Sequence, residues 1–133
     1  MGPGSGCCGV PRRLTVKDCF TQGKERMRAP MLPIQGRPAR GASGLTVQFS
    51  LRAHQDRLEA VSFRASSCVT LVAYCELLSE WATGNSREEA LELQAAELIA
   101  ALPEVPLHKH DRAHLAIAAL GAALDQAKGD EVL

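Results

Sequence analysis

The sequence predicts an α+β domain in which a small antiparallel β-sheet carries helices packed on one face. Apolar and polar residues alternate over residues 45–65, as in half-buried strands, and the apolar spacing after them is that of helices. The 133 residues suit one compact domain, which we expect to span residues 13–133. Residues 1–12 are rich in Gly and Pro, so we expect a flexible tail there.

The composition limits both the core and the partners. Apolar residues make up 46% and aromatic residues 4%, so the core must consist of Leu, Val, Ala and Ile. The formal net charge is zero, which argues against a nucleic-acid-binding protein. No apolar run reaches the ~20 residues of a membrane span, and the N-terminal region lacks the apolar segment of a signal peptide. We therefore expect a cytoplasmic protein without a membrane or nucleic-acid partner.

The charge is distributed unevenly along the chain. Residues 1–40 contain eight Lys or Arg and two Asp or Glu, a net charge of +6, whereas residues 41–133 contain seven and thirteen, a net charge of −6. Two interpretations are open. Either the basic tail is solvated or folds back on an acidic domain, or it docks on an acidic partner.

The beginning of the domain predicts a short helix and then a loop. Residues 14–28 place Val16, Cys19 and Phe20 on one side of a helix, where Cys19 serves as a small buried apolar residue. Residues 29–44 contain three Pro and three Gly, which predicts an extended loop.

A β-hairpin is predicted after this loop. In residues 45–53 alternate residues are apolar and share one face of a strand, namely Leu45, Val47, Phe49 and Leu51. A turn at residues 54–57 leads to a second strand at residues 58–65, whose apolar residues are Val61 and Phe63. One face of the hairpin should therefore rest on a core.

Helices make up the rest of the chain. The first is expected over residues 68–84, with an N-cap from Ser66–Ser67 and an end at Gly84. Asn85 or Ser86 caps the second helix, whose first turn is acidic.

Two more helices complete the prediction. A short one at residues 95–102 is stopped by Pro103, and the last one runs over residues 111–128. The apolar stripe predicted for the last helix consists of Leu115, Ile117, Ala118, Leu120 and Leu124.

The cysteines point to reduced thiols. Their number is odd and no signal peptide is predicted, and no CxxC motif indicates a zinc ribbon or a thioredoxin-like site. The five are Cys7, Cys8, Cys19, Cys68 and Cys75.

Cys68 is the most informative of them, because it follows a predicted strand and opens a helix. The free N–H groups and partial positive charge of a helix N-terminus stabilise a thiolate, which can act as a nucleophile or a metal ligand. A half-buried apolar cysteine is the alternative. Cys75 lies two helical turns further on, too far to share one metal ion with Cys68, and is expected in the core.

A second polar cluster is the run LHKHDRAH. His110 and His114 have the i,i+4 spacing of a helical metal pair, but the Glu of the metalloprotease motif HExxH is missing. Solvated surface histidines are the alternative to a metal pair.

The motifs FRASSC, EWATGNSREEAL and LPEVPLH follow one another and precede an Ala-rich last helix. In this order they resemble the IscU/NifU N-terminal family of iron–sulfur cluster assembly scaffolds, with a likeness that covers roughly residues 14–128. The resemblance implies the α+β fold of that family and a scaffold that is not an enzyme. It also implies an Fe–S cluster, or iron or zinc, as the bound species, and a cysteine desulfurase or other assembly proteins as partners.

The resemblance further implies which residues bind the metal or cluster. Cys68 matches the family's helix-opening cysteine and His108 its histidine, so these two are the predicted ligands. The positions of the other two cysteines hold Ser43 and Lys109, and the usual acidic position holds Leu45.

Fe–S clusters require mostly thiolate ligands, so two ligands are too few. The missing ones would come from Cys7 and Cys8, from a homodimer that pools two Cys68/His108 pairs, or from His110 or Asp111.

Three functions therefore stay open. The first is a divergent scaffold that holds or passes iron or an Fe–S cluster through Cys68 and His108. The second is a persulfide acceptor that uses only Cys68, with Lys109 stabilising its thiolate. The third is an interaction module of the assembly machinery that binds no metal.

Overall fold

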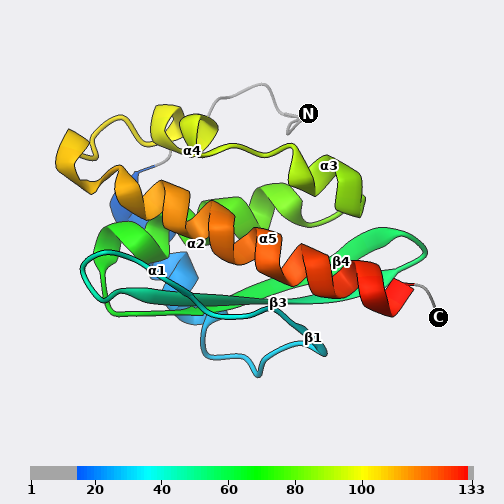
Figure 1. Ribbon diagram of the computed structural model, residues 1–133. Helices are drawn as coiled ribbons and strands as arrows, with labels where there is room; N and C mark the ends of the chain where they lie inside the picture. The colour runs from blue at the N-terminus through cyan, green and yellow to red at the C-terminus, as the bar shows by residue number, and fades with distance from the viewer. Residues whose placement is uncertain (1–14, 132–133) are drawn as a thin grey trace.

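The structure is a computed structural model that describes residues 15–131, with side chains as far as Ala127. A four-stranded antiparallel sheet carries α2 and α5 on one face, while α1 packs against α2 (Figure 1). The elements are α1 (Val16–Arg26), β1 (Ile34–Gln35), β2 (Ala39–Arg40), β3 (Thr46–His54), β4 (Arg57–Ala65), α2 (Val69–Ala82), α3 (Arg87–Leu91), α4 (Ala95–Ala101), η2 (Leu107–Lys109) and α5 (Asp111–Glu131). The predicted α+β fold class is confirmed.

The hairpin of β3 and β4 forms the centre of the sheet. Phe49 pairs with Phe63, and their ring centroids lie 5.7 Å apart inside the core. The turn is shorter than predicted: it consists of Gln55 and Asp56, which both adopt positive φ, as tight hairpin turns require. An irregularity between Arg52 and Ala53 shifts the register before the turn.

The predicted loop at residues 29–44 contains two very short strands. β1 and β2 each pair with β3 over only two residues, because Pro and Gly interrupt the ladder on both sides. The segment before β1 covers the outer face of the hairpin. The backbone N–H of Leu32 donates to Ser50 Oγ over 3.0 Å, and this contact explains why Ser50 is buried although it points away from the helices.

The last helix is three residues longer than predicted and packs through small residues. Its buried face consists of Ala113, Leu115, Ala116, Ala119, Leu120, Ala123, Leu124 and Ala127. Ala118, expected in the apolar stripe, is exposed instead, because the stripe follows the alanines. These small residues allow a close approach: a Cβ atom on Gly36 would lie 2.5 Å from the backbone nitrogen of Ala123.

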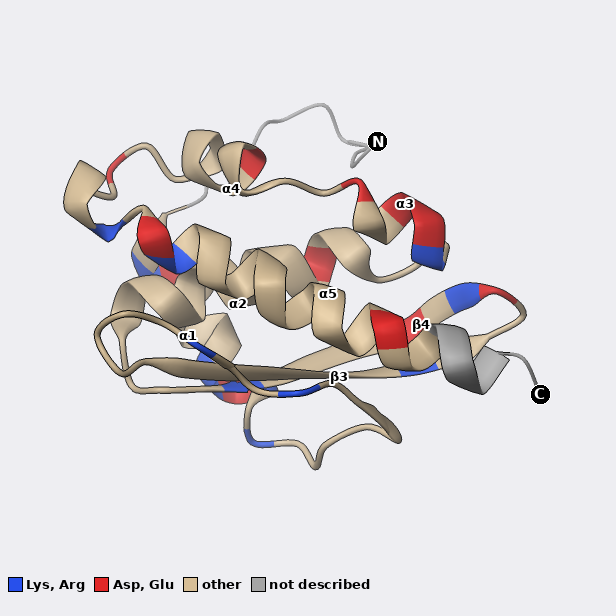
Figure 2. Cartoon of the chain, in the orientation of Figure 1, with Lys and Arg blue, Asp and Glu red and all other residues tan. Residues whose placement is uncertain are grey.

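Acidic and basic residues lie mostly on different elements. Figure 2 shows Asp and Glu concentrated around α3 and its neighbours, whereas Lys and Arg are common along the sheet and the segments before it. This agrees with the acidic character predicted for residues 41–133. The role of residues 1–12 lies outside the described residues and stays a prediction. Among residues 15–131, none of the helices combines the length and apolar character that a membrane crossing requires.

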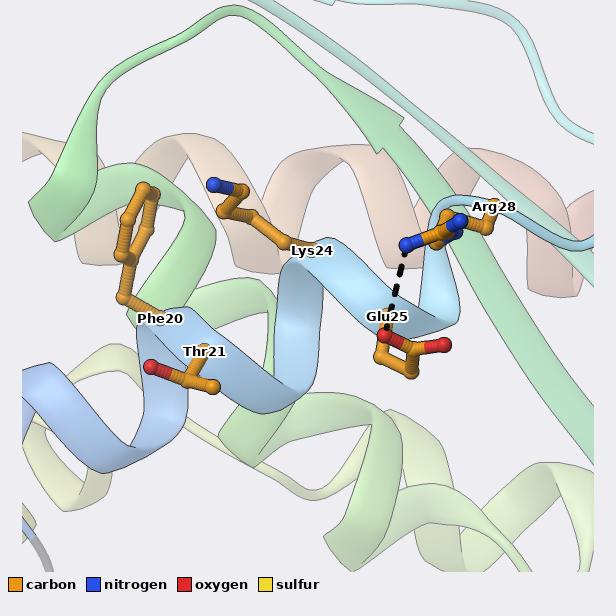
Figure 3. A pocket seen from close by; sticks show the side chains of 5 residues that line it. All are labelled: Phe20, Thr21, Lys24, Glu25 and Arg28. Atoms are coloured by element: carbon orange, nitrogen blue, oxygen red, sulfur yellow. Dashed lines mark ion pairs between the residues drawn. The ribbon is translucent and has the colours of Figure 1, made fainter.

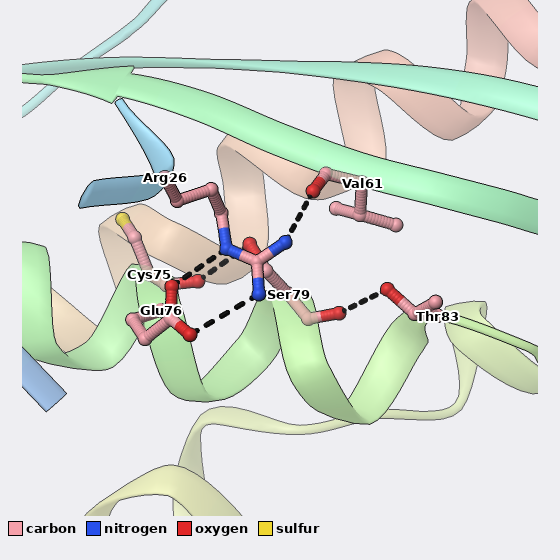
Figure 4. A network of polar contacts seen from close by, with 6 residues as sticks. All are labelled: Arg26, Val61, Cys75, Glu76, Ser79 and Thr83. Atoms are coloured by element: carbon pink, nitrogen blue, oxygen red, sulfur yellow. Dashed lines mark hydrogen bonds and ion pairs between the residues drawn. The ribbon is translucent and has the colours of Figure 1, made fainter. Parts of the chain in front are cut away.

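A half-buried ion pair joins α1 to α2 and to the sheet (Figure 4). Arg26 donates from Nε to Glu76 Oε1 over 2.6 Å and from Nη2 to Glu76 Oε2 over 3.1 Å. Its Nη1 donates to the carbonyl oxygen of Val61 over 2.7 Å. Removing either charged partner would leave the other one desolvated, so this contact fixes the position of α1. Cys19 is buried at the same interface, as predicted.

Glu80 lies one helical turn beyond Glu76 on α2. Burial, together with the hydrogen bond and charge of Glu76, raises the pKa of Glu80 to about 7, while Arg26 acts in the opposite direction. Burial and the charge of Glu80 raise the pKa of Cys19 to about 12. The α1–α2 interface therefore favours a protonated Glu80.

We predict that Glu80→Gln reduces the pH dependence of stability. The folded protein keeps the Glu80 proton up to about pH 7, whereas the unfolded chain releases it near its ordinary pKa of about 4.3. The stability due to this proton is thus complete below about pH 4 and lost as the pH rises through about 7. Urea unfolding at about pH 5 and about pH 8 gives the free energy of unfolding at each pH. The decrease in this free energy from pH 5 to pH 8 should be larger for the unmodified protein than for Glu80→Gln. Equal losses would contradict the prediction.

Candidate functional site

Cys68 is the N-cap of α2, a position that the sequence analysis assigned to Ser66–Ser67. Its backbone is extended (φ −127°, ψ 119°), and its carbonyl accepts from the backbone N–H of Val72 over 2.9 Å. Its side chain makes no capping hydrogen bond, which leaves the sulfur free for other contacts. The thiol is half-buried at the start of the helix, where the dipole and the free N–H groups favour a negative charge.

Ser66 is not a cap because it belongs to the sheet. Its backbone N–H donates to the Thr46 carbonyl over 3.0 Å, and its Oγ accepts from the Thr46 N–H over 2.9 Å. These two bonds extend the pairing of β3 and β4 by one residue. They leave only Ser67 between the end of the sheet and Cys68, so the sulfur is held close to a rigid edge.

The loop that holds Ser43 comes back to the same end of the sheet. The N–H of Gly41 donates to the Leu45 carbonyl over 2.7 Å, and Gly44 closes the turn with a φ of +84°. A Cβ on Gly41 would lie 3.1 Å from Leu115 Cδ2, so the loop packs on the first turns of α5. Ser43 itself is exposed and offers a hydroxyl where the resemblance implied a thiol.

Arg112 lies in the first turn of α5 and is largely buried. Its Nη1 donates to Asp111 Oδ1 over 2.6 Å, and its side chain is only 17% exposed. The hydrogen bond with Asp111 and then the interaction with the Cys68 side chain raise the pKa of Arg112. The guanidinium is thus held by a carboxylate at the start of α5 and carries a permanent positive charge there.

One atom of this guanidinium is unsatisfied. Nε of Arg112 is buried and has no hydrogen-bond partner among the described residues. The nearby sulfur therefore does not complete a hydrogen bond to Nε as a simple thiol. Sequence reasoning did not single out Arg112, because its burial depends on the packing of α5 against other elements.

His108 and Lys109 lie in η2, directly before α5. Figure 1 shows η2, the start of α5 and the start of α2 at the same end of the molecule. His108 is exposed, and the neighbouring Leu107 is 81% exposed. The structure thus places His108 in the segment that leads to Arg112. Its pairing with Cys68 as a ligand stays a prediction.

The other described thiols are not available for such chemistry. Cys19 and Cys75 are both buried, and burial is the main cause that raises the pKa of each. Cys75 is a core residue, as predicted. Cys7 and Cys8 lie outside the described residues, so their proposed role as ligands is untested.

Within residues 15–127, no three side chains of His, Cys, Asp or Glu come together as a group that could hold a metal ion. His110 has its Nε2 3.1 Å from the carbonyl oxygen of Val105, and His114 is exposed. Asp111 is engaged by Arg112. The described part of one chain therefore supplies too few ligands for a cluster, whichever of these residues assists Cys68.

A hollow on the outer side of α1 is separate from this site (Figure 3). It is lined by Phe20, Thr21, Lys24, Glu25 and Arg28. Lys24 Nζ lies 5.3 Å from the centre of the Phe20 ring, and a loose ion pair of 3.8 Å joins Arg28 to Glu25. The hollow contains neither a thiol nor a histidine, so it adds no ligand to Cys68.

Comparison with known proteins agrees with this architecture. A crystal structure described only as a hypothetical protein matches with a TM-score of 0.55 and 19% identity, over 82% of this chain and 98% of that one. An iron–sulfur cluster assembly scaffold assigned to the SUF system of Fervidobacterium islandicum AW-1 matches with a TM-score of 0.49 and 12% identity, over 84% and 92% of the two chains. No curated protein matches the sequence. The model of the NifU-like N terminal domain family matches residues 21–132, and the chain therefore belongs to this family.

Proposed function

We propose that the protein takes part in iron–sulfur cluster assembly and carries sulfur as a persulfide on Cys68. Membership of the NifU-like N-terminal domain family supports a role in iron–sulfur cluster assembly. The observation that carries the chemical role is the position of Cys68: a half-buried thiol at the start of α2 whose side chain makes no capping hydrogen bond. In this role the protein is a carrier and not an enzyme.

The proposed reaction is a sulfur transfer from a protein persulfide, such as that of a cysteine desulfurase. The Cys68 thiolate attacks the outer sulfur of the donor R–S–SH, and a new S–S bond forms on Cys68 while the donor's S–S bond breaks. The donor leaves as R–SH with the proton, and Cys68–S–S⁻ remains. No external oxidant or reductant is needed, and the start of α2 and Arg112 stabilise the anion before and after the transfer.

One thiol is sufficient for this reaction, and that is why it fits better than cluster binding by a single chain. A bare 2Fe–2S cluster takes four protein ligands. Lys109 is a cation where the family resemblance implied a thiolate, and it repels metal ions while it favours anions.

A second candidate is the binding of iron, zinc or an Fe–S cluster through Cys68 and His108. It is favoured by the exposure of His108 in η2, a segment that lies at the same end of the molecule as the start of α2 (Figure 1). Val69 and Leu107, the neighbours of these two residues, are 48% and 81% exposed, which suits a surface that a second molecule covers. A homodimer or another assembly protein would then supply the remaining ligands.

We predict that Cys68 gains the mass of one sulfur atom when the reduced protein is incubated with a cysteine desulfurase and L-cysteine. Cys19 and Cys75 should stay unmodified in the folded protein, because both are buried. Mass spectrometry of peptides under non-reducing conditions measures the adduct and its position. An adduct only on other cysteines would refute the proposed role of Cys68.

Cys68→Ser is a matched variant for this experiment and carries its own prediction. Serine at an N-cap accepts a backbone hydrogen bond that the cysteine does not form, so the variant should be as stable as the unmodified protein or up to about 1 kcal/mol more stable. Urea unfolding measures the difference in the free energy of unfolding between the variant and the unmodified protein. A clear destabilisation would show that the thiol is chiefly a packing residue.

The second candidate is tested by anaerobic analysis of iron, zinc and acid-labile sulfide per chain. If Cys68 and His108 are ligands, Cys68→Ser and His108→Ala should each remove most of the bound metal, and bound cluster should accompany a dimer or a complex. His54→Ala is a suitable control, since His54 is also exposed and lies at the end of β3 beside the hairpin turn. Metal contents unaffected by the first two substitutions would exclude this site. If the protein binds no metal and Cys68 gains no sulfur, the remaining function is the third one, an interaction module of the assembly machinery that binds no metal.

A further inference from the structure

Helix α1 is fastened at both of its ends by carboxylates that belong to other parts of the chain. At its N-terminal end the backbone N–H of Val16 donates to Glu104 Oε2 over 2.8 Å. At its C-terminal end Arg26 donates to the two carboxylate oxygens of Glu76 over 2.6 and 3.1 Å (Figure 4). An α-helix of 11 residues is about 16 Å long, so the two contacts are too far apart to affect each other directly.

Between these two ends α1 has little surface in the core. Of its residues only Cys19 and Gly23 are buried. A Cβ atom on Gly23 would lie 2.6 Å from Val72 Cγ1, so α1 fits closely on α2 at one position. Isolated helices shorter than about 12–15 residues are only marginally stable in water. We therefore expect α1 to be helical only while it is docked, and to leave α2 as a whole rather than from one end.

Glu104 belongs to the α4–α5 link, by which we mean residues 102–110. The link contains η2 with the exposed His108. Two of its contacts are local: Val105 is buried, and its carbonyl oxygen lies 3.1 Å from Nε2 of His110. Glu104 is bonded instead to the start of a helix 88 residues earlier in the chain. The position of the link thus depends in part on whether α1 is docked.

We propose that α1 couples its interface with α2 to the α4–α5 link: docked, it holds the link through Glu104, and undocked, it sets the link free. The coupling follows from cooperativity. Loss of the contact at the C-terminal end removes the docking that keeps α1 helical, and the N–H of Val16 then leaves Glu104. A partner that binds α1 would thereby change the mobility of the segment that carries His108. This inference goes beyond the proposed function and holds for either cargo of Cys68.

The full-length protein contains separate reporters for the two events. Cys19 lies on the docked face of α1 and is 4% exposed, so its rate of alkylation by N-ethylmaleimide measures how often α1 undocks. The backbone N–H groups of Val105 and His110 donate to carbonyl oxygens within the link, so their hydrogen exchange measures how often the link opens. Cys75 is fully buried in the core, and its alkylation reports global unfolding. Peptide mass spectrometry resolves the thiols, and neither measurement needs sulfur transfer or a bound metal.

Arg26→Gln removes the C-terminal contact and leaves a desolvated carboxylate unpaired, so it should raise the alkylation rate of Cys19 about tenfold. Exchange in the link should rise by a similar factor, although Glu104 itself is unchanged. Arg28→Gln is the matched control, because the side chain of Arg28 is 78% exposed and forms only a loose ion pair of 3.8 Å. Both rates should stay nearly unchanged in this control. Glu104→Ala tests the coupling from the other end, and it should raise Cys19 alkylation several-fold.

Faster alkylation of Cys19 in Arg26→Gln without faster exchange in the link would overturn the inference. So would a Glu104→Ala variant in which Cys19 stays as protected as in the unmodified protein, or equal effects in Arg28→Gln, which would show that loss of surface charge is sufficient. Fast alkylation of Cys75 would show that Arg26→Gln unfolds globally. Arg26→Lys then takes its place, because it keeps the charge and loses the planar two-donor contact. Both rates should rise together by a smaller factor, and a rise in only one of them would again overturn the inference.

Discussion

The site depends on one structural constraint, the closure of the sheet where β4 ends and α2 begins. Thr46 and Ser66 exchange backbone and side-chain hydrogen bonds of 2.9–3.0 Å across the two strands. The chain has only Ser67 left before Cys68 becomes the N-cap of α2. If this closure were one residue longer or shorter, another residue would take the N-cap position of α2 and the thiol would leave the start of the helix. The stability of the hairpin therefore determines the geometry of the thiol.

The fold could be predicted from sequence wherever local patterns decide it. The alternation in residues 45–65 identified the hairpin, and Ser86, one of the two predicted N-caps, caps α3 in a capping box with Glu89. Features that depend on distant partners were missed. The short strands β1 and β2 exist only because β3 offers an edge, and the register shift at Arg52–Ala53 appears only when the two strands are aligned.

The site was predictable to a similar extent. Cys68 stood out because a cysteine between a strand and a helix has a recognisable sequence context, and the structure shows it as the partly exposed thiol among the described cysteines. His108 came from the family resemblance alone. Arg112 had no signal of its own, because its importance arises from the packing of α5 beside α2, which no local pattern encodes.

Charge around the thiol explains what kind of cargo the site suits. A metal site would need carboxylates or further thiolates near Cys68, but Asp111 is bound to Arg112, and Lys109 and Ser43 occupy the positions where the resemblance implied cysteines. The helix N-terminus at Cys68 attracts anions and repels cations such as Fe²⁺. A persulfide sulfur is the anion that a cysteine can itself carry. Ser43 and Lys109 each replace a thiol that the resemblance implied, and the proposed sulfur carrier needs neither of those thiols.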